Sequence, residues 1–243
     1  MLPLMRDALF LPSGGLRYHL RALAYRRTLW LPFRRQVAAW LAEWQPPCDR
    51  VVLVGPSAGH TLPLTWLERF AEWVVLEPDP LARWWLARRA PGPWRFEPAL
   101  DLRCEGGVAA LADRYPDAAL LFCNLLGQLG PPDGGTTWPS VLAQALAGRH
   151  WASWHDVLST SRRPDCADPA ARVLPGGSEL PAVVGYFWSG GRLEVVDHAT
   201  FALGGDVAHA YALWRLRPRR WHLIEWVTPR QRSPGSRRRC HSS

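Results

Sequence analysis

The stretch VVLVGPSAGHTLPLTWLERFAEWVVLEPDP, residues 51–80, holds the pattern that decides the fold. An apolar run at 51–54 is followed by a glycine turn, a segment at 61–73 with helical spacing, and a second apolar run that ends on Glu77. Apolar runs without two-residue alternation are typical of strands that are buried on both faces of a parallel sheet. The stretch therefore predicts a strand, a helix and a second, parallel strand.

The same alternation continues on both sides of this stretch. Two amphipathic helices are expected within 14–45, with Leu16, Leu20 and Leu23 on the apolar stripe of the first. Further strands are predicted at 94–97, 118–126 and 151–159, and helices at 80–90, 106–116 and 138–150. Strands and helices in alternation predict an α/β fold with helices on both faces of the sheet.

The pattern changes after residue 160. Residues 160–181 are rich in Pro, Gly and Arg and are expected to be a loop. Two hairpins are predicted beyond it, one from 182–188 and 192–201, the other from 209–216 and 220–227. We therefore expect an N-terminal helical cap at 1–47, a sheet domain at 48–229 and a disordered basic tail at 230–243.

The net charge of +8 is carried by the two ends of the chain. Residues 1–50 hold 8 Arg and 3 acids, residues 228–243 hold 5 Arg and no acid, and the segment between is slightly acidic. The five cysteines are scattered without metal-ligand spacing, so no metal is expected. The N-terminus has no long apolar segment after a basic start, so no secretory signal is expected, and no apolar run reaches about 20 residues. We therefore expect a cytoplasmic protein with no membrane partner.

The glycine turn between the first two strands has the chemistry of a nucleoside site. Gly55 and Gly59 let a ligand approach the backbone N–H groups at the start of a helix. Glu77 follows 18 residues after Gly59, where an acid can accept hydrogen bonds from both ribose hydroxyls. Dinucleotide sites require G-x-G-x-x-G, and here Ser57 holds the middle position without a third glycine, which argues against NAD.

At these residues the chain resembles the class I S-adenosylmethionine-dependent methyltransferases. The resemblance covers roughly residues 48–229, with Leu53 in place of an acid usual in that family. It implies a Rossmann-like, mostly parallel seven-stranded sheet that ends in an antiparallel hairpin, and S-adenosylmethionine as cofactor. The cofactor-binding residues that it implies are Gly55, Ser57, Gly59, Glu77, Asp101 beside the adenine, and Asn124 at the tip of the fourth strand.

The candidate catalytic residues are His155 and Asp156, at the end of the fifth strand. Only one of them can face the site, because successive strand residues point to opposite faces. His60 could touch the cofactor, and Tyr18 and His19 could close over it; packing roles are the plainer interpretation. The methyl acceptor is open: a small molecule, a protein or RNA.

The competing hypothesis is a non-catalytic Rossmann-like interaction protein. In that case Gly55 and Gly59 are ordinary turn residues, Glu77 is a solvated helix cap, and the Arg-rich ends bind RNA or a protein partner. No DNA-binding motif is present. The arginines of the N-terminal helices could equally form a solvated face.

Overall fold

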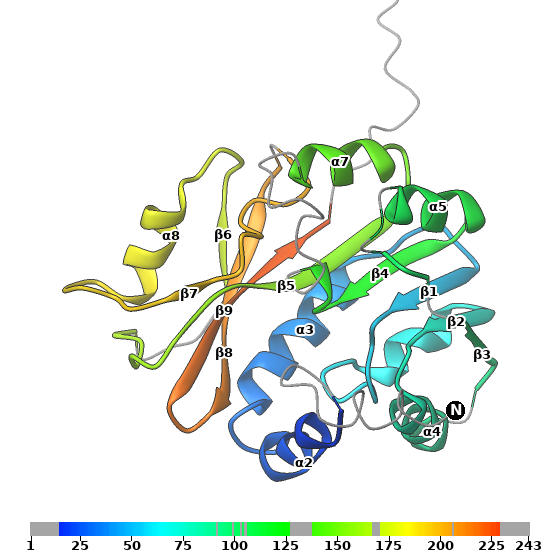
Figure 1. Ribbon diagram of the computed structural model, residues 1–243, viewed down its shortest axis with the longest axis horizontal. Helices are drawn as coiled ribbons and strands as arrows, with labels where there is room; N and C mark the ends of the chain where they lie inside the picture. Colours follow the sequence, from blue (N-terminus) through cyan, green and yellow to red (C-terminus); the bar gives the residue numbers. More distant parts are fainter. Residues whose placement is uncertain are drawn as a thin grey trace, which may run out of the picture.

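The computed structural model describes residues 15–90, 92–98, 100–102, 104, 106–126, 138–166, 171–205 and 207–228. These residues form a central twisted sheet with a layer of helices on each face (Figure 1). The predicted basic tail at 230–243 lies outside the described residues. Among the residues described, no helix is both long and apolar enough to cross a bilayer.

The strands form a single mixed sheet in the order β3-β2-β1-β4-β5-β9-β8-β6, with β7 paired to β5. Strands β1 to β5 are parallel, and β9 is antiparallel to both β5 and β8. The predicted seven-stranded, Rossmann-like arrangement with its C-terminal hairpin is thereby confirmed, and β6 and β7 are short additions. The bounds are β1 (Arg50–Val54), β2 (Glu72–Leu76), β3 (Trp94–Glu97), β4 (Ala119–Cys123), β5 (Trp151–Thr160), β6 (Arg172–Leu174), β7 (Val196–Asp197), β8 (His209–Arg217) and β9 (Arg220–Val227).

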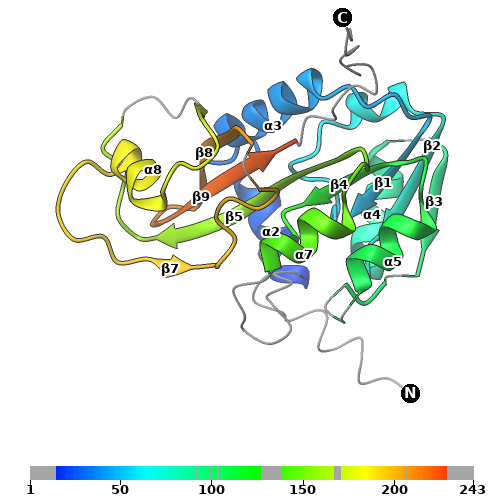
Figure 2. The same ribbon diagram turned by 90° about the horizontal axis from the view of Figure 1, so that it is seen from above.

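Helices cover both faces of the sheet, as the alternation of strands and helices predicts. Figure 2 shows α3 on one side of the sheet and α5 with α7 on the other. Side chains alternate between the two faces, so that Val51 and Leu53 lie in one core cluster, and Val52 and Val54 in the other. The helices are α2 (Gly15–Tyr25), α3 (Leu31–Glu43), the 3-10 helix η1 (Leu64–Arg69), α4 (Pro80–Arg89), α5 (Gly107–Arg114), α7 (Trp138–Ala145) and α8 (Leu180–Phe187).

The N-terminal helices belong to the same core as the sheet. Phe33 stacks on Trp214 at 4.9 Å between ring centroids, and Trp40 stacks on Trp226 at 5.4 Å. The Trp30 indole N–H donates a hydrogen bond to the carbonyl of Leu216. The described part of the expected cap, residues 15–47, thus buries Trp30, Phe33 and Trp40 against β8 and β9.

Helix α2 turns a different face inward from the one its sequence suggests. The expected stripe of Leu16, Leu20 and Leu23 is 40%, 57% and 43% exposed, whereas His19 and Ala22 are fully buried. That expectation was wrong because His19 hydrogen-bonds to buried partners, described below, and a leucine in its place could not form these bonds.

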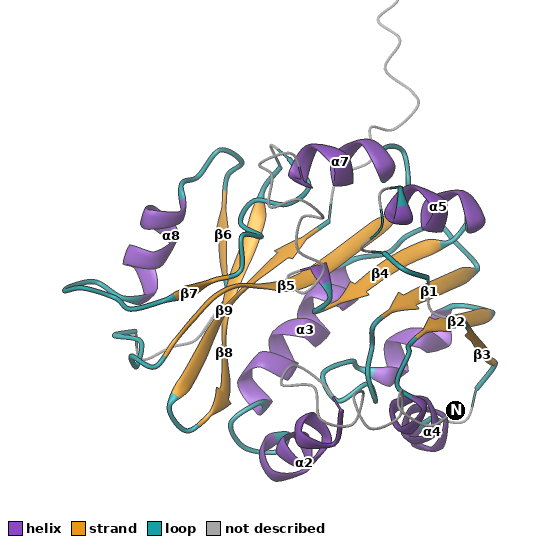
Figure 3. Cartoon of the chain, in the orientation of Figure 1, coloured by secondary structure: helices purple, strands orange, loops and turns teal. Residues whose placement is uncertain are grey.

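Two further expectations fail because long-range packing overrides local pattern. The helix expected at 61–73 is only the short η1, since the chain is still extended at Pro63 and extended again at Phe70. The strand expected at 182–188 is the helix α8 (Figure 3). Its Pro181 lies in the first turn, and Val183 and Phe187, one turn apart, are buried against β5, β8 and β9.

The loop expected at 160–181 and the hairpin expected at 182–201 are also corrected in part. The loop region contains β6, which pairs with β8. The second arm of the hairpin contributes only β7, which pairs with β5 instead of with 182–188. These pairings are decided by strands that lie far away in the sequence.

Candidate functional site

The glycine turn follows β1, and every second residue of it from Gly55 to Gly59 has a left-handed backbone conformation. Gly55, Ser57 and Gly59 all have positive φ, at 65°, 52° and 62°. The Gly55 N–H donates to the carbonyl of Leu76 at 3.0 Å, so the turn begins bonded to β2. Because Ser57 has a Cβ, its left-handed conformation costs about 1–2 kcal/mol, and the surrounding contacts must hold it.

Glu77 is the main contact that holds the turn. Its side chain is buried, with the residue 6% exposed, and it faces the turn. Its Oε2 accepts the Ser57 N–H at 2.7 Å, and its Oε1 accepts the Asp79 N–H at 3.0 Å. Burial raises the pKa of Glu77, while the two N–H groups act in the opposite direction. Each carboxylate oxygen has a second lone pair that remains able to accept a hydroxyl.

Close packing on the turn explains why both glycines are needed: α4 packs against Gly59, and Leu125, which follows β4, packs against Gly55. A Cβ at Gly59 would lie 2.7 Å from Cδ1 of Leu86, and one at Gly55 would lie 3.2 Å from Cδ1 of Leu125. The Arg89 guanidinium donates to the carbonyl of Ala58 at 2.6 Å. Burial is the main reason that the pKa of Arg89 is lowered to about 10.

Helix α2 covers the turn through a chain of polar contacts. His19 Nε2 lies 3.2 Å from Asp79 Oδ2, and His19 Nδ1 lies 3.2 Å from His60 Nε2. The simplest proton assignment has His60 Nε2–H donating to His19, and His19 Nε2–H donating to Asp79. This leaves His60 neutral, and burial, followed by the charge of Arg89, lowers the pKa of His60 to about 3.

Tyr18 lies beside His60, on the side of α2 next to the sheet. The Tyr18 and His60 rings are 5.8 Å apart between centroids. Burial raises the pKa of Tyr18, and the nearby charges of Glu77, Cys123 and Asp156 raise it further. The phenol is therefore near the side chains of Glu77, Cys123 and Asp156. The sequence predicted that Tyr18 and His19 could close over a ligand, and that role stays a prediction.

Asn124 and Asp156 are brought together on this side of the sheet. Asn124 follows β4 with a positive φ of 54°, and its N–H donates to the carbonyl of Trp154 at 2.8 Å. Its side chain hydrogen-bonds to Asp156. Burial alone would raise the pKa of Asp156, but nearby His222 and His198 and the bond from Asn124 outweigh it and lower that pKa. His222 Nδ1 lies 3.2 Å from Asp156 Oδ2.

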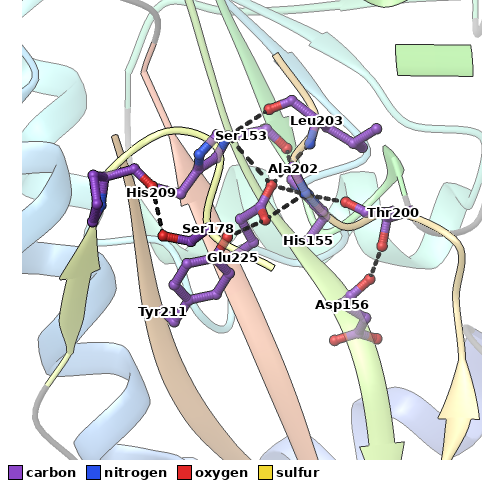
Figure 4. Close-up of polar contacts among 11 residues, drawn as sticks. Ser153, His155, Asp156, Ser178, Thr200, Ala202, Leu203, His209, Tyr211 and Glu225 are labelled. Carbon is purple, nitrogen blue, oxygen red and sulfur yellow. Dashed lines mark hydrogen bonds and ion pairs between the residues drawn. The ribbon is translucent and has the colours of Figure 1, made fainter. Parts of the chain in front are cut away.

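His155 points to the opposite face of β5 and is fully buried in another cluster (Figure 4). Its Nδ1 lies 3.0 Å from Ser153 Oγ, and its Nε2 lies 3.1 Å from the Thr200 carbonyl and 3.2 Å from Glu225 Oε1. Of the two candidate catalytic residues, only Asp156 lies on the face that carries Tyr18 and Asn124.

Glu225 is the centre of this second cluster. The carboxylate has no exposure to solvent, and it accepts the N–H groups of Ala202 and Leu203 at 2.8 and 3.1 Å and the hydroxyl of Tyr211 at 2.9 Å. Together with His155, these contacts fasten the loop after β7 to the sheet. A structural role accounts for these contacts of His155 with Ser153, Thr200 and Glu225.

Asp101 lies in the segment between β3 and α5, and its side chain is exposed. Its carbonyl accepts a hydrogen bond from Cys104. Its predicted place beside an adenine stays a prediction.

Sequence reasoning passed over two residues of this site, His198 and His222. They stand in different segments, a loop and β9, at a separation of 24 residues that matches no ligand motif. His222 also falls in an apolar strand where a buried core histidine is the ordinary interpretation. Only the pairing of β9 with β5 places His222 beside Asp156.

Comparison with known proteins gives likeness in structure only. No family model matches the chain, and no curated protein matches it. Among solved structures, the DhpI complex with S-adenosylhomocysteine (SAH) is 14% identical, covers 93% of this chain and 98% of that one, and has a TM-score of 0.39. The N-terminal domain of EvdMO1 with SAH bound is 13% identical, covers 81% of this chain and 81% of that one, and has a TM-score of 0.44. A SAM-dependent methyltransferase from Aquifex aeolicus is 10% identical, covers 84% of this chain and 98% of that one, and has a TM-score of 0.38.

Because these TM-scores are below 0.5, the likenesses carry no weight here. The assignment of the fold rests on the strand order and on the antiparallel hairpin formed by β8 and β9.

Proposed function

We propose that this protein is a methyltransferase that uses S-adenosylmethionine as its methyl donor. The observation that carries the proposal is the contact between Ser57 and Glu77. Ser57 lies in a left-handed turn at the end of β1, and Glu77, at the end of β2, is buried and faces that turn. In open α/β sheets, ligands bind at the carboxyl ends of the strands near the point where strand order reverses, here between β1 and β4.

The proposed cofactor lies across this edge of the sheet. Glu77 accepts hydrogen bonds from the ribose hydroxyls with the lone pairs that Ser57 and Asp79 leave available. Gly55 and Gly59 allow the ligand to approach the backbone. The methyl end points toward Asn124 and Asp156, and Tyr18 covers it from α2.

The reaction is an in-line displacement at the methyl carbon of a sulfonium. The carbon–sulfur bond breaks as the acceptor atom forms its bond to the methyl group, and S-adenosylhomocysteine leaves with the electron pair. The protein contributes mainly position and orientation. We propose Asp156, and not His155, as the residue that faces the acceptor, because Asp156 shares a face of the sheet with Asn124 and Tyr18.

Calorimetric titration with S-adenosylhomocysteine tests the proposal. We expect binding to the wild-type chain and a dissociation constant about 10- to 100-fold weaker for Glu77→Gln, since hydrogen bonds to a charged group contribute about 1.5–3 kcal/mol. Unfolding of the variant is followed in parallel, because Glu77 also holds the Ser57 N–H and its loss lowers stability as well.

Glu72→Gln is the matched control. Glu72 lies at the first residue of β2, away from the carboxyl edge, and pairs with Arg50 and Arg95. Its substitution should leave the dissociation constant unchanged. Absence of binding by the folded wild-type chain at millimolar ligand, or equal affinities for wild type and Glu77→Gln, would remove the proposed cofactor role.

A further inference from the structure

We propose that Asp156, His198 and His222 form a binding site for a divalent transition-metal ion of the Zn²⁺ type. One potential ligand atom from each residue lies within 4.8 Å of those from the other two. The three residues come from β5, from the loop that follows β7, and from β9. The site goes beyond the proposed function, since the binding of an ion does not depend on a methyl donor.

The donor set matches the chemistry of such ions. Two imidazole nitrogens and one carboxylate oxygen are typical ligands of zinc and of other first-row transition metals, whereas Mg²⁺ and Ca²⁺ prefer oxygen alone. Zinc bonds of about 2.0–2.1 Å place the ligand atoms of a tetrahedral site roughly 3.4 Å apart. Asp156 Oδ2 and His222 Nδ1, at 3.2 Å, already have that separation, and the ligand atom of His198 lies within 4.8 Å of those of the other two residues.

Several polar atoms of the cluster have unmet hydrogen bonds. His222 is 8% exposed; its Nε2 has no hydrogen-bond partner among the described residues, and its Nδ1 has the contact with Asp156 Oδ2 at 3.2 Å without the geometry of a hydrogen bond. Within those residues, His198 Nε2 and Asp156 Oδ1 also have no hydrogen-bond partner. Burying polar groups without partners is costly, and native structures rarely do it. A metal ion would bind these atoms, whereas an ion pair between Asp156 and His222 leaves most of them unsatisfied.

The two imidazole rings of the cluster lie close to each other. The His198 and His222 rings are nearly parallel, 14° apart, with centroids 6.2 Å from each other. Arg220, the nearest cation on β9, donates instead to Ser159 Oγ at 2.7 Å.

Three protein ligands leave a coordination position open. Catalytic zinc sites have this composition and hold water or substrate in the fourth place. Asp156 and His198 are partly buried as residues, although His198 Nε2 and Asp156 Oδ1 are themselves buried atoms. Because Asp156 also contacts Asn124, an ion held here would lie near the proposed methyl donor and could bind an acceptor through an oxygen atom. This last step alone rests on the proposed function.

The test is a titration of chelator-stripped full-length protein with Zn²⁺ in competition with a chromophoric chelator. We expect the wild type to bind one ion per chain. His198→Ala should weaken the affinity for Zn²⁺ at least about 100-fold, because even residues that only support metal ligands change metal affinity by about 10- to 100-fold. Zn²⁺ should also raise the unfolding temperature of the wild type but not of His198→Ala. Co²⁺ should give the visible absorption of a tetrahedral site.

His150→Ala is the matched control, since His150 immediately precedes β5 at the opposite end of its parallel segment. It should bind Zn²⁺ like the wild type. His198 is in a loop and only partly buried, so its variant tests the site even if the buried His222→Ala fails to fold. The proposal is overturned if the wild type binds no Zn²⁺ at micromolar concentration, or if His198→Ala keeps the wild-type affinity. Failure to bind S-adenosylhomocysteine would leave the metal result unaffected.

Discussion

The backbone N–H of Ser57 donates to Oε2 of Glu77 across 2.7 Å, which joins the middle of the glycine turn to an acid 20 residues away. The bond fixes two properties of the site at once. It holds a serine in the left-handed conformation, and it keeps a carboxylate facing the turn in a buried position.

We therefore expect Ser57→Gly to stabilise the protein slightly. Glycine adopts φ near +52° without the cost of about 1–2 kcal/mol that a Cβ imposes, and it keeps the N–H that Glu77 accepts. Its greater freedom in the unfolded chain offsets about 0.5–1 kcal/mol of that gain. Chemical denaturation should show a net gain of up to about 1 kcal/mol. Ser57→Ala, which keeps the Cβ, is the control and should show no gain.

Glu225→Gln should be among the most destabilising single changes. The amide group of glutamine would place its NH2 donor against the N–H group of either Ala202 or Leu203, in a position with no access to water. Breaking a buried charged network typically costs about 3–5 kcal/mol. The free energy of unfolding in urea measures this loss, and Glu72→Gln, which breaks a partly exposed pair with Arg50, should cost less than about 1 kcal/mol. Equal losses in the two variants would contradict a structural role for the Glu225 cluster.

Stability should fall as the pH is lowered through the range between about 6.5 and 3, because of His60. Its folded-state pKa is lowered from 6.5 to about 3, so in this window the unfolded chain binds a proton that the folded chain does not. Stability then rises with pH by up to about 1.4 kcal/mol per unit. His60→Gln should show a correspondingly shallower slope of unfolding free energy against pH. Parallel slopes for wild type and variant would show that His60 is not held neutral.

Trp40→Ala should destabilise the whole fold and not only the N-terminal helices. Trp40 stacks on Trp226 at an interplanar angle of 8°, and both belong to the core cluster that includes β1 and β4. Loss of a buried Trp costs about 3–5 kcal/mol. Unfolding followed by far-ultraviolet circular dichroism should remain one cooperative transition at lower denaturant. A separate early transition would instead support an independent cap with a boundary near residue 47.

Much of the fold could be predicted because its signals are local. The runs at 51–54 and 118–126 are apolar without alternation, and that pattern by itself indicates strands buried on both faces. Gly55, Gly59 and Glu77 could be identified for the same reason. A strand, a turn, a helix and a second parallel strand bring the turn and the acid to the same edge of the sheet.

The errors arose where a segment's conformation depends on distant partners. Residues 182–188 have strand-like composition, yet they form α8 because Val183 and Phe187 pack on β5, β8 and β9. Helix α2 turns its leucines outward because His19 finds Asp79 and His60 inside. Neither set of partners can be identified from the segment alone.

The sequence by itself determined the α/β class, the order of strands and helices along the parallel part of the chain, and the presence of an acid downstream of a glycine turn. These features could be identified because backbone periodicity and turn chemistry are encoded within a few residues. Tertiary structure decided which of His155 and Asp156 faces Tyr18, and it alone brought His198 and His222 to Asp156. The direction of a strand's side chains relative to a site, and the register between β5 and β9, exist only once the sheet has formed.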